Sequence, residues 1–355
     1  MTAAHKILIL GASYGSLLGM KLALAGHDVT LVCLPAEAEA IYRDGVEVRM
    51  PIRGRDGLVV LNSKQAPGSI RAAGTDVDPA DYDIVGLAMQ EPQYRQPAVK
   101  ALMTRVAASR VPAMSIMNMP PLAYLRRLPG LDAEALGGAY ADTGVWNAFD
   151  PAKITLASPD PQAFRPPEEA PNVLQVSLPT NFKVAAFEDP ADTAILRRLE
   201  SDIAAVRHEV DGTSIELPVK LKVHDSVYVP LAKWAMLLTG NYRCVTAEGP
   251  RAIRDAVHGD PALAAEVYAW VMDVCVAMGA DRDDLVPFEK YAAAAKGLAK
   301  PSSAARALYA GAPAIERVDR MVQAIAGSHG MHHDTVDETV ALVDALLAQN
   351  AKAAA

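Results

Sequence analysis

The chain has 355 residues, of which 51% are hydrophobic and only 5% aromatic, and it carries a formal net charge of −8. The length predicts two domains, and the acidic balance argues against nucleic acid or an anionic membrane as the main partner. The three cysteines, Cys33, Cys244 and Cys275, are widely spaced and odd in number, which indicates reduced thiols in the cytoplasm. The first apolar run is too short for a secretory leader, and no run reaches membrane-spanning length.

Residues 6–32 predict a strand, a glycine turn that opens a helix, and a second strand. Such a unit binds a dinucleotide pyrophosphate at the helix N-terminus, where unpaired N–H groups and the helix dipole favour negative charge. Gly11 and Gly15 are four positions apart, whereas the common pattern has outer glycines five apart and another between them. A purely structural unit is therefore the alternative. The residues predicted to contact the dinucleotide are Gly11, Ala12, Ser13, Tyr14, Gly15 and Ser16.

The N-terminal part alternates short apolar runs with helical patterns, which predicts a parallel, doubly wound sheet. Ligands of such sheets lie outside the carboxyl ends of the strands, which directs attention to Gln90 and Asn118 as well as to the glycine turn. Residues 159–171 are rich in Pro, Glu and Asp and predict an exposed loop, and residues 189–205 predict a helix. The further predicted strands are 59–61, 84–88, 113–117, 138–145, 154–156, 173–176 and 183–186.

After about residue 218 the patterns are almost entirely helical. We therefore expect a Rossmann-type dinucleotide-binding domain over residues 1–217 and an all-α domain over residues 218–355, which would serve substrate binding and homodimer formation. Residues 348–355 are expected to be a frayed helix end. The predicted helices are 228–238, 251–255, 262–278, 287–299, 314–326 and 335–348.

Two further groups of residues could carry chemistry. Residues 329–334 hold three histidines and an aspartate, a set that can bind zinc, but Gly330 and Thr335 indicate a helix stop and a helix start, so we predict no metal site. Residues 216–225 alternate apolar and polar side chains, which indicates an edge strand or a loop at the rim of a cleft. An acid–base pair of His224 and Asp225 is the alternative.

Several segments stand in a recognisable order and spacing. They are residues 15–19, 25–32 and 43–45, Asn118 and Lys233, and residues 301–303 and 316–319. In these segments the chain resembles the ketopantoate reductase (2-dehydropantoate 2-reductase) family. This resemblance implies a Rossmann domain followed by a helical domain like the C-terminal one of 6-phosphogluconate dehydrogenase, with the active site in the cleft between them. The implied reaction is hydride transfer from a nicotinamide to the ketone of a small 2-oxo acid.

By this resemblance, Lys233 is the general acid that protonates or polarises the ketone oxygen. The reaction needs such a cation because negative charge develops on that oxygen. The resemblance also implies that Asn118 contacts cofactor and lysine, and that Asn241 and Ser303 hold the substrate. The structural alternatives are a lysine whose amine reaches solvent from a helix, a turn or N-cap for Asn118, and a helix C-cap for Asn241.

Departures from the family pattern affect the substrate. Relatives usually carry an asparagine one turn after the lysine, where this chain has Leu237. The family's substrate-binding glutamate falls in register on Ile315, and Glu316 follows one residue later, a step that turns a helical side chain by about 100°. We retain Glu316 as a substrate-binding candidate, with an exposed helical charge as the alternative. These departures mean that the sequence does not identify ketopantoate as the substrate.

The cofactor choice between NADP and NAD stays open at this stage. Leu34 and Gln90 stand where relatives that use NADPH place the arginine and the lysine that read the 2′-phosphate. An acidic residue of the kind that reads NAD is also missing at the end of the second strand. Arg43, Lys64 and Arg71 could reach a phosphate from loops, although each has the character of a solvated surface residue.

The sequence thus predicts an NAD(P)H-dependent oxidoreductase that reduces a small 2-oxo acid with Lys233 as general acid and Asn118 beside the cofactor. The expected partner is a small carboxylate substrate, with neither nucleic acid nor membrane. An opine- or imine-reducing dehydrogenase is one alternative, with His224 and Asp225 as its catalytic pair. A catalytically silent dinucleotide- or ligand-binding protein is the other.

Overall fold

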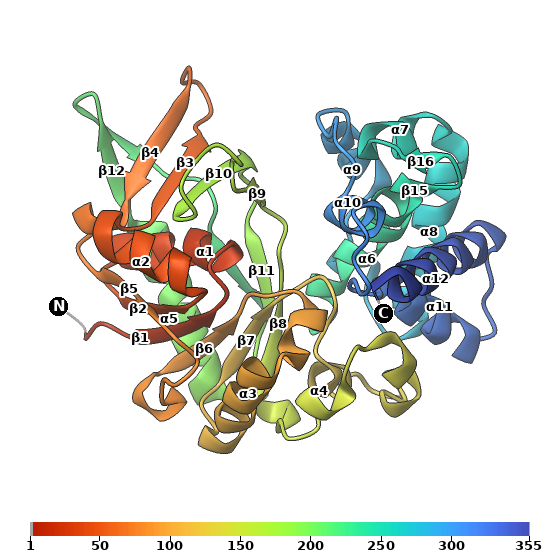
Figure 1. Cartoon of the computed structure of the whole chain (residues 1–355), viewed down its shortest axis with the longest axis horizontal. Coiled ribbons are helices and arrows are strands. Elements are labelled where there is room, and N and C mark those ends of the chain that lie inside the picture. Colours follow the sequence, from red (N-terminus) through yellow and green to blue (C-terminus); the bar gives the residue numbers. More distant parts are fainter. Residues whose placement is uncertain (1–2, 355) are drawn as a thin grey trace. The chain divides into compact units, whose positions relative to one another are not determined.

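The computed structural model describes residues 3–354, which form two compact units (Figure 1). Unit 1 comprises the chain up to Met89 together with residues 93–124 and 144–225. Unit 2 comprises residues 90–92 and 125–143 and the chain from Ser226 onward. Two short segments of the N-terminal half therefore belong to the C-terminal unit.

An eight-stranded sheet in the order β14-β11-β8-β7-β6-β1-β2-β5 is the centre of unit 1 and confirms the predicted doubly wound sheet. All neighbouring strands are parallel except β8 and β11. The chain order reverses between β1 and β6, which is the switch point where such sheets bind ligands. The strands are β1 Lys6–Leu10, β2 Asp28–Val32, β5 Ser69–Ala73, β6 Ile84–Leu87, β7 Ala113–Ile116, β8 Ile154–Ser158, β11 Phe182–Ala185 and β14 Leu221–His224.

Helices cover both faces of this sheet, which is why its central strands are apolar along their whole length. Helices α1 (Tyr14–Leu24) and α5 (Pro190–Ala205) pack side by side on one face, and α3 (Pro97–Ser109) lies on the other (Figure 1). Asp189 caps α5, as the predicted helix 189–205 requires, because its carboxylate accepts the N–H of Ala191.

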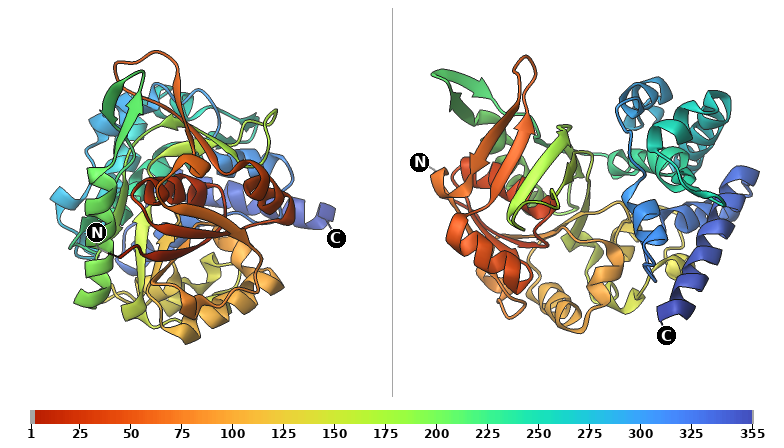
Figure 2. Two further views of the ribbon diagram at one scale, coloured as in Figure 1. Left: turned by 90° about the vertical axis from the view of Figure 1, so that its left-hand side faces the viewer. Right: turned by 45° about the horizontal axis from the view of Figure 1, so that its top comes forward.

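A second, four-stranded sheet in the order β4-β3-β10-β9 corrects two expectations. The run 59–61 lies in β4 (Leu58–Asn62), which pairs antiparallel with β3 (Glu47–Pro51) instead of joining the parallel sheet. The segment 159–171 contains β9 (Gln162–Phe164), paired with β10 (Val173–Leu178), in addition to loop. The β3–β4 hairpin extends from the main sheet in both views of Figure 2.

Segment 138–145 is not the predicted strand. It forms 3₁₀ turns at Glu134–Ala139 and Thr143–Val145. The N–H of Ala141 donates to both carboxylate oxygens of Glu91, at 3.2 and 3.1 Å, and so does not enter a strand ladder. Two adjacent glycines, Gly137 and Gly138, further weaken a strand here.

Lys21 of α1 is buried, with only 1% of its surface exposed. Its Nζ donates to the carbonyl oxygens of Pro218 and Leu217, at 3.0 and 3.4 Å, and so ties α1 to the segment before β14. Burial, with a smaller contribution from the nearby charge of Lys220, lowers the pKa of Lys21 to about 7. The following strand β14 is the edge strand that the alternating pattern of residues 216–225 predicts.

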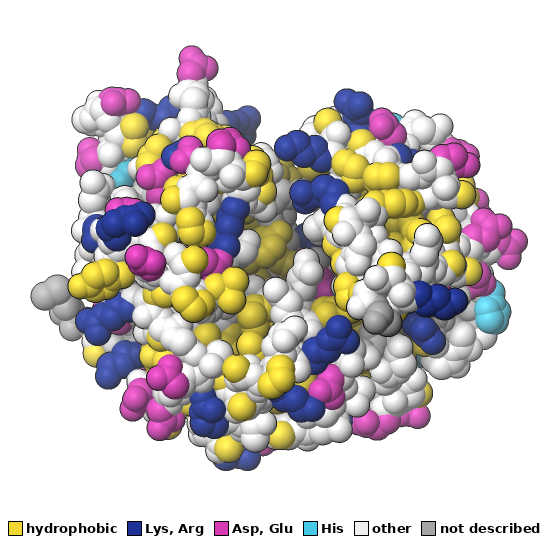
Figure 3. Space-filling model, in the orientation of Figure 1, with side chains coloured by type: hydrophobic (Ala, Val, Ile, Leu, Met, Phe, Trp, Pro, Cys, Tyr) yellow, Lys and Arg dark blue, Asp and Glu magenta, His cyan; other side chains and the backbone are white. Residues whose placement is uncertain are grey.

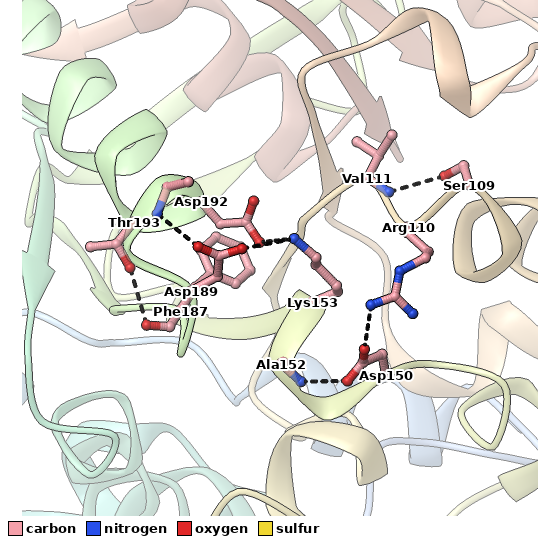
Figure 4. A network of polar contacts seen from close by, with 11 residues as sticks. Ser109, Arg110, Val111, Asp150, Ala152, Lys153, Phe187, Asp189, Asp192 and Thr193 are labelled. Atoms are coloured by element: carbon pink, nitrogen blue, oxygen red, sulfur yellow. Dashed lines mark hydrogen bonds and ion pairs between the residues drawn. The ribbon is translucent and has the colours of Figure 1, made fainter.

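Polar contacts of Lys153 join the start of β8 to the start of α5 (Figure 4). The Nζ of Lys153 lies 2.7 Å from Asp192 and 3.2 Å from Asp189. Because Asp189 is also the N-cap of α5, one lysine fixes the helix start against the sheet. Acidic and basic side chains are interspersed on the face seen in Figure 3.

Unit 2 is helical, with one two-residue hairpin formed by β15 (Val245–Thr246) and β16 (Gly249–Pro250). Helices are present at the predicted ranges 251–255, 262–278, 287–299, 314–326 and 335–348, with shifted ends, and α11 begins four residues later than expected. The predicted helix 228–238 is not continuous, and α10 was not predicted. Within the described residues 3–354, no helix is long and apolar enough to cross a membrane. The helices are α6 Lys233–Met236, α7 Ile253–His258, α8 Pro261–Ala277, α9 Phe288–Ala295, α10 Ser303–Tyr309, α11 Val318–Ser328 and α12 Asp334–Ala354, which continues through the residues expected to fray.

Candidate dinucleotide and substrate sites

The shortened glycine turn retains two of the roles that glycines have in dinucleotide-binding units. Gly11 has φ +101°, and a Cβ there would lie 2.6 Å from Met89 Cγ and 2.9 Å from the Ala88 carbonyl oxygen. Gly15 lets α1 approach β1, since a Cβ there would lie 2.8 Å from Ile9 Cγ2. Gly11 therefore permits the turn and Gly15 permits close helix–strand packing, without the middle glycine of the common pattern.

The N-terminus of α1 lacks a side-chain cap, as do those of α3, α7, α9 and α11. Ser13 is the N-cap residue, yet its hydroxyl accepts no hydrogen bond from the first turn. At α5, α8 and α10 the side chains of Asp189, Asp260 and Ser302 do accept one. The Ser16 hydroxyl donates a hydrogen bond to the carbonyl of Ala12, four residues earlier, at 2.5 Å. The first-turn amides of α1 are therefore not capped by Ser13, an arrangement that fits a bound pyrophosphate.

The predicted residues at the strand ends lie along the same sheet edge. Gly11 follows β1, and Asn118 lies half-buried in a bend after β7. β6 runs between these two strands, so Gly11 and Asn118 flank its carboxyl end. Gln90 comes three residues after the last residue of β6 and groups with unit 2.

The end of β2 carries an acid and a base that sequence reasoning missed. Glu37, near the start of α2 (Pro35–Asp44), accepts the N–H of Leu34 at 3.0 Å and forms an ion pair with Arg165, which follows β9. Burial raises the pKa of the neighbouring Cys33 to about 11, and the Glu37 charge adds to this shift. Pro35 and Glu37, at the first and third positions of α2, are a helix-start signal in the sequence, whereas nothing local indicates Arg165.

The other basic candidates lie elsewhere. Lys64 donates to the carbonyls of Tyr42 and Arg43 at the C-terminus of α2, at 3.2 and 2.7 Å, and Arg43 pairs with Asp44. A helix of this length puts these residues about 15 Å from the end of β2. Arg71 lies within β5, opposite Thr30.

In unit 2, the segment that contains Lys233 is not the continuous α-helix predicted for residues 228–238. A 3₁₀ turn (Val229–Ala232) leads into α6, and a π turn (Leu237–Asn241) follows. The N–H of Tyr242 donates to the Leu237 carbonyl, five residues back. Lys233 is half-buried at the first position of α6.

The hydroxyl of Tyr291 accounts for the π turn. The hydroxyl of Tyr291 donates to the Met236 carbonyl at 3.1 Å, and this carbonyl is the acceptor that Gly240 would use in an α-helix. Gly240 leaves room for that hydroxyl, since a Cβ at this position would overlap it. A π turn takes up about one residue more than an α turn, so Asn241 returns to within about 20° of the Lys233 direction.

The backbone of Asn241 is hydrogen-bonded to Ser302, the residue before the predicted substrate-binding Ser303. The Ser302 hydroxyl donates to the Asn241 carbonyl at 2.7 Å and accepts the N–H of Ala305 at 3.1 Å as the N-cap of α10. Ser303 is the exposed first residue of that helix. Leu237, which replaces the family asparagine, is buried with 3% of its surface exposed.

Glu316 differs from the exposed helical charge that was its alternative. It lies before α11, outside any helix, and only 8% of its surface is exposed. Its Oε1 accepts the N–H of Glu91 at 3.3 Å, and its carbonyl accepts the Tyr242 hydroxyl at 2.6 Å. Because Tyr242 directly follows Asn241, one segment joins Asn241, Ser302 and Glu316 in the same part of unit 2.

The remaining candidate groups make other contacts. Asp225 is an exposed partner of Arg197, at 2.8 Å, and His224 pairs in register with Ala185 at the sheet edge. His333 lies against Trp270, with ring centroids 5.5 Å apart. No cluster of three or more His, Cys, Asp or Glu suited to a metal ion occurs between residues 3 and 354.

Comparison with known proteins relates the whole chain to one fold. No family model matches the sequence, and no curated protein does. A protein assigned as a ketopantoate reductase from Ralstonia solanacearum MolK2 has a TM-score of 0.66 at 17% identity, over 98% of this chain and 99% of that one. D-mandelate dehydrogenase, solved with NADH and anilino(oxo)acetate, has a TM-score of 0.62 at 14% identity, over 97% and 99%.

A dimeric ketopantoate reductase from Staphylococcus aureus has a TM-score of 0.58 at 11% identity, over 97% of this chain and 99% of that one. At such identities the likeness establishes the fold. Both the glycine-turn unit and the helical unit fall within the matched length. The chain therefore has the fold of the ketopantoate reductases along almost its entire length.

Proposed function

We propose that this protein is an NAD(P)H-dependent reductase of a small 2-oxo acid. The observation that carries the proposal is the glycine turn, where Gly11 has no room for a side chain and the Ser13 hydroxyl accepts no hydrogen bond from the first turn of α1. D-mandelate dehydrogenase supports the reaction class, because it was solved with NADH and anilino(oxo)acetate, a 2-oxo acid derivative.

The nicotinamide, when bound, supplies the hydride. Lys233 donates the proton to the ketone oxygen, and its ammonium group stabilises the negative charge that develops there. Asn118, at the sheet edge beside β6, orients the cofactor. Asn241 and Ser303 hydrogen-bond the substrate, and the buried carboxylate of Glu316 accepts from a substrate hydroxyl.

Residues 1–217 are proposed to bind the dinucleotide, and residues 218–355 to bind the substrate and form a homodimer in the cytoplasm. The dimeric Staphylococcus aureus structure supports the oligomeric state. Light scattering on the purified protein tests it: twice the 37.6 kDa chain mass is expected, and a single chain mass would contradict the dimer.

The decisive experiment replaces Lys233 by methionine, which keeps the length of the side chain and removes its charge. We expect turnover of 2-oxo acids to fall by about 10²- to 10⁴-fold while NADH or NADPH affinity is retained. Lys290→Met, at an exposed position of α9, is the matched control and should leave turnover unchanged.

Two outcomes would contradict the proposal. Full turnover in Lys233→Met would remove the lysine mechanism and leave the oxidoreductase class in place. Dinucleotide binding by the natural chain, without turnover of any 2-oxo acid, would favour the silent binding protein. His224→Ala addresses the opine- or imine-type alternative, and we expect it to retain turnover because Asp225 is held by Arg197 at the surface.

A further inference from the structure

We propose that the Glu37–Arg165 ion pair reads the adenosine ribose and makes the protein select NADH over NADPH. This inference rests on the proposed dinucleotide function and assigns the cofactor choice within it. The residues lie at the carboxyl end of β2, all within unit 1.

Position is the first step of the argument. In a dinucleotide-binding βαβ unit, the end of the second strand faces the adenosine ribose, where a carboxylate accepts from the 2′-hydroxyl or an arginine accommodates a 2′-phosphate. Leu34 occupies the expected place in the sequence and carries neither group. Glu37 and Arg165 bring both groups to this strand end, one from the start of α2 and one from the segment after β9.

The carboxylate of Glu37 is held firmly. Only 9% of the residue is exposed; Oε2 accepts the N–H of Leu34 at 3.0 Å, and Oε1 pairs with Nη1 of Arg165. An ionised carboxylate offers about four acceptor positions, so these two contacts leave capacity for a ribose hydroxyl.

Arg165 supplies the complementary donor. Its side chain is 31% exposed, and a guanidinium has five N–H donors, of which the Glu37 contact uses one. The pair therefore presents both acceptor and donor with no net charge. A neutral ribose hydroxyl can donate to Glu37 and accept from Arg165, whereas a 2′-phosphate must approach the Glu37 carboxylate and shares the Arg165 cation with it.

The side chain next to this pair also suits a bound adenosine. Leu34 is 69% exposed and is one of four large hydrophobic side chains that are exposed to solvent in residues 3–354. An apolar side chain at this strand end gives a flat contact for an adenine ring beside the groups that read its ribose. The basic side chains of Arg43 and Lys64 are engaged at the far end of α2 and do not supplement Arg165.

The test measures binding directly, by titrating the purified full chain with NADH and with NADPH and following nicotinamide fluorescence. The natural chain should bind NADH about tenfold or more tightly than NADPH, the effect of one charge-assisted hydrogen bond. Glu37→Gln should reduce this preference by about tenfold, and Arg165→Gln should increase it, because the carboxylate then loses its cation. Glu39→Gln, on the exposed side of the same helix, is the matched control.

Opposite shifts of the two variants distinguish recognition from loss of folding, and thermal unfolding without nucleotide checks each variant. Tighter binding of NADPH by the natural chain would overturn this inference and leave the proposed function standing. So would equal NADH-to-NADPH ratios in Glu37→Gln, Arg165→Gln and Glu39→Gln. Binding of neither nucleotide by the natural chain would overturn both proposals.

Discussion

The glycine turn of unit 1 and the Lys233 segment of unit 2 are built in different ways. The positive φ of Gly11 and the close approach of Gly15 to Ile9 belong to one strand–turn–helix segment, although a Cβ at Gly11 would also meet Ala88 and Met89, far along the chain. The Lys233 segment takes its shape from Tyr291, a distant residue whose hydroxyl donates to the Met236 carbonyl. The glycine turn thus combines local backbone geometry with one distant contact, while the shape of the Lys233 segment depends on how helices pack.

The largest expected effect comes from a substitution in the glycine turn. Gly11→Ala adds a Cβ at φ +101° that would lie 2.6 Å from Met89 Cγ, so we expect a loss of about 2–4 kcal/mol in unfolding free energy. Dinucleotide affinity should fall by roughly tenfold or more. Chemical denaturation and nucleotide titration measure the two effects.

Gly57→Ala separates crowding from backbone strain. Gly57 also has positive φ, +77°, but a Cβ there would meet nothing within 4 Å. Its replacement should cost only about 1 kcal/mol and leave nucleotide affinity unchanged. Equal losses in the two variants would show that the close approach at Met89 and Ala88 is unimportant.

Lys21 tests the same comparison, because its side chain connects α1 to the distant residues Leu217 and Pro218 within unit 1. Its pKa of about 7 lies below the unfolded value near 10.5, so the unfolded chain binds more protons between these values. The unfolding free energy should therefore rise with pH across this window, by up to about 1.4 kcal/mol per pH unit. Below pH 7 both states bind the proton, so the unfolding free energy no longer changes with the titration of Lys21 and the cost of burying its charge is fully present.

Denaturation series at several pH values test this dependence. Lys21→Met should flatten the rise, and Lys290→Met, at an exposed site, should retain it. A rise that persists unchanged in Lys21→Met would show that other groups cause it.

The smallest effect concerns the π turn. Tyr291→Phe removes the hydrogen bond to Met236 and should cost about 1 kcal/mol in stability. If the turn aligns Asn241 with Lys233, kcat should fall by roughly tenfold with nucleotide affinity unchanged.

Tyr268→Phe is a suitable control, since its hydroxyl also donates to a backbone carbonyl, that of Val286 at 2.8 Å, and its ring stacks on Tyr291. It should lose similar stability but retain kcat. Equal kcat values in the two variants would remove the positioning role of the Tyr291 hydroxyl.

The sequence by itself determined the local elements. Apolar runs located β1, β6 and β7, the Asp189 cap located α5, and the glycine spacing located the start of α1. These signals are local, because a buried strand or a capped helix end needs particular residues at fixed short spacings. The prediction of strand 138–145 was wrong because Glu91, from another part of the chain, takes the Ala141 N–H.

Only the tertiary structure decided the contacts between distant residues. Arg165 reaches Glu37 across 128 positions, and Glu316 is buried against Glu91 across 225. Sequence periodicity records which face of an element is buried and carries no information about which side chain of another element meets it. The glycine turn could therefore be predicted from residues 11–15, while the ion pair at the end of β2 and the burial of Glu316 required the packed chain.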